Sequence, residues 1–313
     1  MRGTASSARS RVTRTRTAAD PAWRGRGAPL PRLPMARKQK NGHDPWARWR
    51  IATPGAPVSL ASFDPAEKPL SSGNKADDRN RVDELAQELD ALQNLFYADR
   101  RFKLLLVLQG LDTSGKDGTL RAVLGRMSPI GVRTVAWQAP TPVERAHDFL
   151  WRIHQQVPAA GEIVCFNRSH YEDVLVPVVT GQISGADKER RYAQINDFER
   201  LLVETGTVVL KFMLHISRRE QRERLQERID DPEKRWKFQR GDLDVRKQWD
   251  AYQLAYEQAL AATATPWAPW TIVPADSKTH RNVMIALGLR DTMRSLDLHY
   301  PDEDPLLRDL KVE

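Results

Sequence analysis

The sequence predicts a three-layer α/β/α fold, in which a parallel five-stranded sheet lies between two layers of helices. From about residue 80 onward, short apolar runs typical of buried strands alternate with longer segments of helical periodicity. The composition, 40% hydrophobic and 29% charged, suits one globular α/β domain with appendages. We find no internal repeat that would favour a solenoid or an array.

The elements follow one another in a regular order. The first predicted helix, 82–97, carries Leu85, Leu89 and Leu92 on one face, and the uninterrupted apolar run after it predicts a buried strand. The predicted strands are 104–108, 132–137, 162–166, 207–214 and 270–273. The other predicted helices are 116–127, 142–156, 187–205, 217–229, 243–262 and 279–295. Right-handed crossovers would connect the five strands into one parallel sheet.

The chain is basic overall, but its charge is unevenly distributed. Residues 1–50 hold 13 Arg and Lys against 2 Asp, a surplus of 11, so the remainder of a chain of net charge +8 is slightly acidic, at −3. The first 50 residues also lack a sustained apolar period, and we expect them to form a disordered basic head. We divide the rest into an extended segment at 51–79, a catalytic domain at 80–300 and a C-terminal tail at 301–313.

Several interpretations of the basic head are open. It could be an arm that binds RNA or DNA, and its Arg-rich, acid-poor composition also imitates an organelle transit peptide. The run that begins at Met35 resembles an ordinary bacterial start, so residues 1–34 could lie upstream of the true start codon. We favour this last interpretation.

Further features of the sequence concern the location of the protein and the role of its single cysteine. No window approaches the roughly 18 apolar residues of a membrane helix, and no apolar signal segment follows the basic start, so a cytoplasmic location is expected. The single cysteine, Cys165, lies in a predicted strand, where a buried, unreactive thiol is expected.

A glycine-rich turn joins the first predicted strand to the next helix. Its spacing, Gly110-x4-Gly115-Lys116, is that of a phosphate-binding loop. Glycines allow backbone N–H groups to converge on phosphate oxygens, the helix N-terminus adds its positive dipole end, and Lys116 adds a charge. The predicted loop residues, with the lysine, are Gly110, Ser114, Gly115, Lys116, Asp117, Gly118 and Thr119.

One position departs from the usual pattern of such loops. The Ser or Thr that normally follows the lysine is replaced by Asp117, and Thr119 comes two places later. Magnesium must therefore be held differently, and Asp112 inside the loop is the predicted oxygen ligand. Mn²⁺ is an alternative metal.

Polar residues follow the predicted strand 162–166, at the edge where doubly wound sheets bind ligands. Asn167 offers a neutral carbonyl where an acid is usual, and Arg168 could stabilise charge on a phosphoryl group during transfer. Alternatively, the two residues cap the strand and pair with Glu172 or Asp173. We expect His170 to be a packed histidine and not a catalytic base.

The segment from about 215 to 245 is predicted to form a helical lid. Ser217 and Glu220 have the spacing of a capping box, and like-charged arginines recur four residues apart along the helix, which favours an anion between them. The alternative is a solvated helix, since Arg219 can pair with Glu223. The lid cations predicted to contact phosphate are Arg218, Arg222, Arg224, Arg228, Lys234 and Lys237.

Five blocks in this chain resemble the family-2 polyphosphate kinases, especially single-domain members that act on AMP and ADP. They are Gly110–Thr119, His147–His154, Phe166–Val174, Asp230–Lys237 and Trp267–Asp276. The resemblance covers about 80–300. It implies a P-loop kinase fold, magnesium, a polyphosphate donor, a nucleotide acceptor (ADP or AMP, with GDP as a further candidate) and homo-oligomers.

By carry-over onto matching positions, the resemblance implies that Asp112 binds magnesium and that Lys116 and Arg168 bind phosphate. Many relatives have Asp where this chain has Asn167, so the resemblance does not carry a direct metal role over to that position. Polyphosphate kinase activity, reversible in direction, is the expected function. The alternatives are an ATP-dependent nucleoside monophosphate kinase and a nucleic-acid-binding protein with an inactive P-loop. We expect no membrane partner and no specific nucleic acid.

Overall fold

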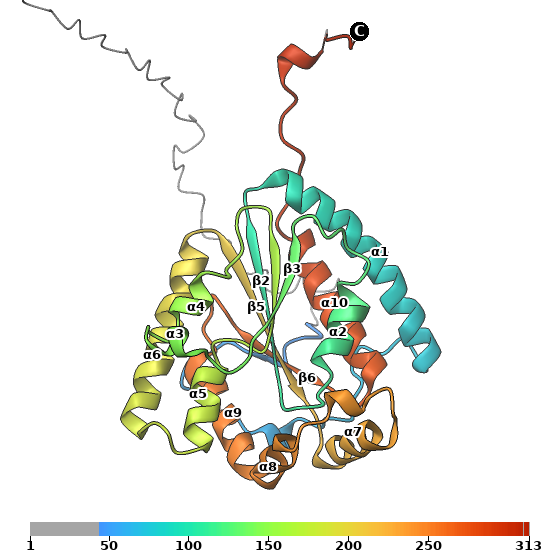
Figure 1. Cartoon of the computed structure of the whole chain (residues 1–313). Helices are drawn as coiled ribbons and strands as arrows, with labels where there is room; N and C mark the ends of the chain where they lie inside the picture. Colours follow the sequence, from blue (N-terminus) through green and yellow to red (C-terminus); the bar gives the residue numbers. More distant parts are fainter. Residues whose placement is uncertain (1–43, 309, 313) are drawn as a thin grey trace, which may run out of the picture.

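The sheet has six strands in the order β1-β6-β5-β2-β4-β3. A computed structural model describes residues 44–308 and 310–312, and Figure 1 shows the sheet between two groups of helices. The strands are β1 (Arg50–Ile51), β2 (Lys103–Gln109), β3 (Val132–Ala136), β4 (Ile163–Asn167), β5 (Thr207–His215) and β6 (Trp270–Pro274). Strands β2 to β6 pair in parallel, as predicted, whereas β1 pairs antiparallel with β6.

Helices cover both faces of the sheet. On one face lie α1 (Lys75–Asp99), α2 (Lys116–Val123) and α10 (Lys278–Arg294), and on the other lie α5 (Glu172–Val179), α6 (Gly185–Glu204) and α9 (Trp249–Thr263). The predicted three-layer architecture is therefore confirmed. The two helices α7 (Arg218–Asp230) and α8 (Gly241–Lys247) lie beyond the carboxyl ends of the strands, at the bottom of Figure 1.

Two predicted helices are interrupted in the structure. The segment 142–156 forms two single turns, α3 (Pro142–Arg145) and α4 (Trp151–His154). Between them the Asp148 side chain accepts the Leu150 N–H at 2.9 Å, a local bond that competes with the helical pattern. The segment 243–262 is likewise divided at Gln248 into α8 and α9. Helix α5 was not predicted.

Residues 44–50 differ from the prediction for the basic head. They form a turn and begin β1, and the side chains of Trp46 and Trp49 are only 5% and 2% exposed. Burial of the two apolar tryptophan side chains accounts for the position of this segment. The predicted head, residues 1–50, was therefore too long. Residues 1–43, and with them the alternatives for the head, lie outside the described residues.

The apolar core lies in the strands and the facing sides of the helices, and it encloses a small charged network. Lys211 on β5 donates to Glu199 on α6 at 2.6 Å and to the Tyr171 hydroxyl at 3.0 Å. His170 is fully buried, and its Nε2 lies 3.2 Å from the same glutamate. The expectation of a packed histidine is thus met. Within 44–308 and 310–312, none of the helices is long and apolar enough to cross a membrane.

Candidate active site

A cavity of about 1050 Å³ opens at the carboxyl edge of the sheet. Its walls come from the glycine-rich loop, the ends of β3 and β4, and the segment from α7 to the start of α8. This is the edge at which open α/β sheets bind their ligands, because the loops after parallel strands meet there. Eleven predicted site residues line it: Asp112, Gly115, Lys116, Asp117, Gly118, Asn167, Arg168, Arg224, Arg228, Lys234 and Lys237.

The glycine-rich loop leaves β2 and enters α2 through backbone conformations that side chains oppose. Gly110 has φ +148°, and a Cβ there would lie 2.7 Å from the carbonyl oxygen of Leu214 on β5. Gly115 has φ +102° and is the N-cap of α2. The loop therefore presents its backbone to the cavity at a helix N-terminus, the arrangement that binds phosphate.

Lys116 is held in place by carbonyl groups of the phosphate-binding loop. Its Nζ donates to the carbonyl oxygen of Gly110 at 2.7 Å and to that of Leu111 at 3.3 Å. Burial and the nearby charge of Arg168 lower the pKa of Lys116 to about 8, against the opposing effect of nearby carboxylates. At neutral pH the ammonium is still charged and lies in the wall of the cavity.

Arg168 connects the end of β4 to two carboxylates. It donates to Asp112 in the glycine-rich loop and to Glu172 at 3.1 Å. Burial by itself lowers the pKa of Arg168, but the carboxylates of Glu172 and Asp112 raise it above its ordinary value. The alternative that Arg168 pairs with Glu172 is thus realised, while the side chain also lies in the wall of the cavity beside Lys116.

Asn167 and Asp117 form a direct pair. The Asn167 side-chain N–H donates to the Asp117 carboxylate at 2.8 Å. The carboxylate that is unusual after the loop lysine therefore lies beside the amide that is unusual at the end of β4. Both residues present side-chain oxygen atoms in the wall of the cavity, the kind of ligand that magnesium prefers.

The donor set fits a magnesium ion that is delivered with a phosphate substrate. Within the described ranges, no three His, Cys, Asp or Glu side chains are close enough to hold a metal by themselves. Magnesium is commonly bound by one or two carboxylates together with substrate phosphates and water. Asp112 and Asp117 supply such oxygens in the wall of the cavity.

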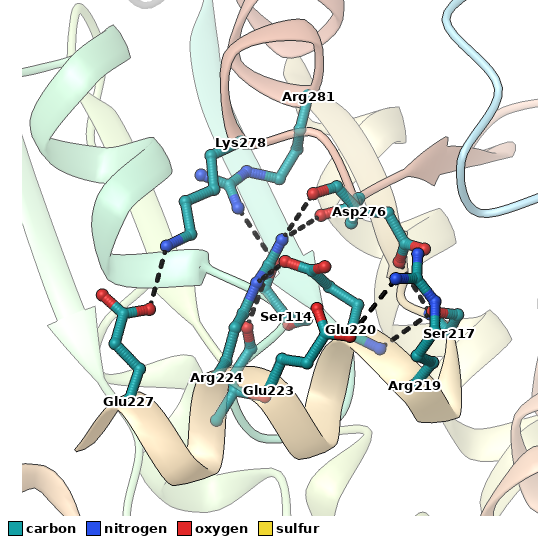
Figure 2. Close-up of polar contacts among 12 residues, drawn as sticks. Ser114, Ser217, Arg219, Glu220, Glu223, Arg224, Glu227, Asp276, Lys278 and Arg281 are labelled. Carbon is teal, nitrogen blue, oxygen red and sulfur yellow. Dashed lines mark hydrogen bonds and ion pairs between the residues drawn. The ribbon is translucent and has the colours of Figure 1, made fainter. Parts of the chain in front are cut away.

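Arg224 does not behave as the predicted lid contact. It is only 6% exposed, and it donates to Glu220 and to four backbone carbonyls, those of Thr113, Ser114, Ala275 and Asp276, at 2.7–3.2 Å (Figure 2). A guanidinium has five N–H donors, and all five are used. We therefore correct the prediction: Arg224 fixes α7 to the glycine-rich loop and has no donor left for phosphate.

The remaining lid cations fall into two groups. Arg228, Lys234 and Lys237 line the cavity, and Arg228 also donates to Asp242 at 3.4 Å. Arg218 and Arg222 are exposed on α7 and do not line this cavity. Ser217 caps α7 by accepting from the Glu220 N–H, and the predicted surface pair of Arg219 with Glu223 forms. Arg224 pairs with Glu220, but the arginine is buried.

Two predicted loop residues face away from the cavity. The Thr119 hydroxyl donates to Asn282 on α10 at 3.3 Å, and Ser114 is fully buried. Neither residue lines the cavity. The Thr119 side chain therefore packs against α10 and not toward the ligand edge.

Sequence reasoning missed a second wall of the cavity. Arg152 on α4 donates to Asp173 at 2.9 Å and to the Gln138 carbonyl at 2.9 Å, and its guanidinium lies 5.2 Å from the centre of the Trp137 ring. Trp137 and Gln138 directly follow β3, so the position of a tryptophan after a strand was the signal available in the sequence. Trp137 is only 8% exposed, so this wall offers a small apolar surface beside a fixed cation.

The fold and the cavity define a P-loop phosphotransferase, since a glycine-rich loop, a buried lysine and several cations surround one space for a polyanion. The family model described as Polyphosphate kinase 2 (PPK2) matches residues 72–300. The chain belongs to this family, and it is an enzyme that transfers phosphate between polyphosphate and nucleotides.

Individual relatives agree with this assignment. An AMP/ADP-polyphosphate phosphotransferase of Meiothermus ruber is 45% identical over 266 residues, which are 85% of this chain and 99% of that protein. An ADP-polyphosphate phosphotransferase of Rhodopseudomonas palustris is 39% identical over 71% of this chain and 81% of its own. The crystal structure of polyphosphate kinase 2 from Arthrobacter aurescens TC1 superposes with a TM-score of 0.80, at 43% identity, over 86% of this chain and 94% of that one.

Proposed function

We propose that this chain transfers the terminal phosphoryl group of inorganic polyphosphate to AMP and to ADP, with magnesium as the metal. The observation that supports it is the convergence of Lys116, Arg168, Arg228 and Lys237 on one cavity that also has Trp137 in its wall. A chain of phosphates and a nucleotide phosphate are both polyanions, and their mutual repulsion must be neutralised before they react. The Meiothermus ruber relative is named for both acceptors.

The chemistry needs positioning and charge more than proton transfer. The oxygen of a nucleotide phosphate is already anionic at neutral pH, so no side chain has to remove a proton from it. Lys116 and Arg168 are held by hydrogen bonds before substrate arrives, so little reorganisation is needed when charge shifts during transfer. Asp112 and Asp117 are the residues that would hold a magnesium ion, which would supply positive charge to offset that of the phosphates.

Three further expectations belong to this proposal. We infer that the enzyme works in the cytoplasm and as a homo-oligomer, and that GDP is a third acceptor. Among the described residues, the cavity is lined by cations on several sides and by one aromatic residue, Trp137, which packs against Arg152. We expect discrimination between bases to depend on this wall.

The test is phosphate transfer by purified protein with magnesium, long-chain polyphosphate and a panel of AMP, ADP, GDP and CDP. We expect ADP to form from AMP, and ATP from ADP. Transfer from ATP to AMP in the absence of polyphosphate, with none from polyphosphate, would instead identify an ATP-dependent kinase. Separation of the products by anion-exchange chromatography distinguishes the two outcomes.

A further inference from the structure

Two buried arginines hold the phosphate-binding loop by its carbonyl groups; Arg224 also lines the cavity, whereas Arg281 does not. Arg224 comes from α7 and Arg281 from α10, and they are 6% and 2% exposed. Figure 2 shows both guanidinium groups near Ser114. Arg224 donates to the Thr113 and Ser114 carbonyls at 2.8 and 3.2 Å, and Arg281 donates to the same Ser114 carbonyl at 3.0 Å.

These bonds fix the direction of one peptide group in the loop. Because the peptide is planar and trans, its C=O and N–H point in opposite directions. The Ser114 carbonyl accepts from two guanidiniums, so the N–H of Gly115 in the same peptide group points away from them. Gly115 lines the cavity, whereas Ser114 does not. The arginines thus hold a backbone donor in the direction where a phosphate oxygen would bind.

The approach of Arg281 also explains why a glycine is needed at 115. A Cβ on that residue would lie 1.8 Å from Nη1 of Arg281, a distance at which the two atoms would overlap. Its φ of +102° opposes a side chain as well. Gly115 therefore makes room for the guanidinium behind the loop, in addition to allowing backbone to approach phosphate in front of it.

The two arginines also leave a surplus of positive charge behind the loop. Arg224 is paired with Glu220 at 2.8 Å. For Arg281, the described part of the chain offers no carboxylate within 4.0 Å, and its side-chain partner is the neutral amide of Asn282. Burial and the nearby charge of Arg224 lower the pKa of Arg281 to about 9, so it remains charged at neutral pH. An anion in the loop would offset this repulsion, which is strong in a poorly hydrated interior.

We propose that Arg224 and Arg281 form a carbonyl clamp, a pair of positioning residues that orient the phosphate-binding loop and add positive potential behind it. The clamp rests on the proposed function only for the identity of the polyanion. It also ties the first two turns of α7 to the binding loop through the bonds of Arg224.

The test measures the affinity for inorganic tripolyphosphate by calorimetry, without nucleotide, and KM and kcat for transfer. The variants are Arg281→Met and Arg224→Met. The matched control is Arg219→Met, because Arg219 is 70% exposed on the same helix and pairs with Glu223 away from the loop (Figure 2). We expect each clamp variant to raise the Kd for tripolyphosphate roughly tenfold or more, as for loss of a charge-assisted contact, and the control to stay within twofold of wild type.

A second variant separates the clamp from a merely structural role. Arg281→Gln keeps an amide donor for the Ser114 carbonyl but removes the charge, and we expect its Kd to lie between those of wild type and Arg281→Met. If folded clamp variants bind tripolyphosphate as wild type does and lose only melting temperature, the proposal is wrong. If a Met variant does not fold, the Kd of Arg281→Gln for tripolyphosphate is compared with that of wild type, and this comparison decides whether the proposal stands. Wild-type protein that binds tripolyphosphate but phosphorylates no nucleotide would contradict the proposed function and leave the clamp standing.

Discussion

The side-chain amide of Asn167 donates a hydrogen bond of 2.8 Å to the carboxylate of Asp117, joining the end of β4 to the first turn of α2. Each residue is unusual for its position in a phosphate-binding site. The pair places the carboxylate that follows the loop lysine one hydrogen bond from the amide at the end of β4.

Replacing this amide by an acid should make folding depend on a cation. In Asn167→Asp, two carboxylates meet where a donor and an acceptor met before, so we expect a loss of about 1 kcal/mol in the free energy of unfolding without metal. Magnesium should recover this loss, and thermal melting with and without it measures the effect. If magnesium raises the melting temperature of variant and wild type equally, the pair does not lie at the metal side of the site.

Removing the lysine of the loop should abolish transfer without unfolding the protein. Lys116→Ala loses a buried, charge-assisted contact to phosphate in the transition state, which is worth on the order of 10² or more in rate. Steady-state kinetics measures the loss, and circular dichroism checks the fold. Lys247→Ala is the matched control, since that lysine is 76% exposed on α8. Wild-type turnover by folded Lys116→Ala would contradict the assignment of the phosphate-binding loop.

The pH dependence of transfer should show the titration of this lysine. The pKa of Lys116 is lowered to about 8, chiefly by burial. The charged form binds phosphate, so kcat/KM should be highest below pH 8 and decline as the pH rises through 8 in the free enzyme. The second ionisation of phosphate, near pH 6, is complete by then. Lys116→Arg, if it retains activity, should lack this decline, because a guanidinium stays charged; an unchanged break near pH 8 would assign it to another group.

Asp112 should matter mainly through the metal. We expect Asp112→Asn to lower transfer and to raise the magnesium concentration for half-maximal rate by about tenfold, since a carboxylate is replaced by a neutral ligand. Glu172→Gln is the comparison, because it also removes a carboxylate partner of Arg168. If both variants change magnesium dependence alike, the effect arises from Arg168 and the metal role belongs to Asp117.

Deleting residues 1–34 should leave transfer unchanged. This segment holds eight arginines against Asp20, a balance of +7 within a net charge of +8. Such a segment would bind phosphate backbones weakly and in a salt-dependent way whatever its purpose. Turnover and polyphosphate affinity of full-length and Met35-start proteins are compared across salt concentrations. A large loss of activity in the shorter protein at physiological salt would show that the head recruits substrate.

The sequence by itself determined the layers, the parallel strands and the phosphate-binding loop. Apolar runs of strand length and the spacing of Gly110, Gly115 and Lys116 depend on neighbours in the chain, and such local patterns are visible without the fold. The end of β4 was also predictable as part of the site, because the carboxyl ends of parallel strands meet at one edge.

Only the tertiary structure decided which charged residues face the ligand and which support the loop from behind. Arg224 and Arg228 are one helical turn apart, look alike in sequence and both line the cavity. The donors of Arg224 are nevertheless all taken by Glu220 and backbone carbonyls, whereas Arg228 donates through Nη1 to Lys237 and Asp242. The burial of Trp46 and Trp49 against the edge of the sheet was equally hidden, as was the approach of Arg281 to Ser114. Each depends on contacts between residues far apart in the chain, and local patterns carry no information about which distant surface a side chain will meet.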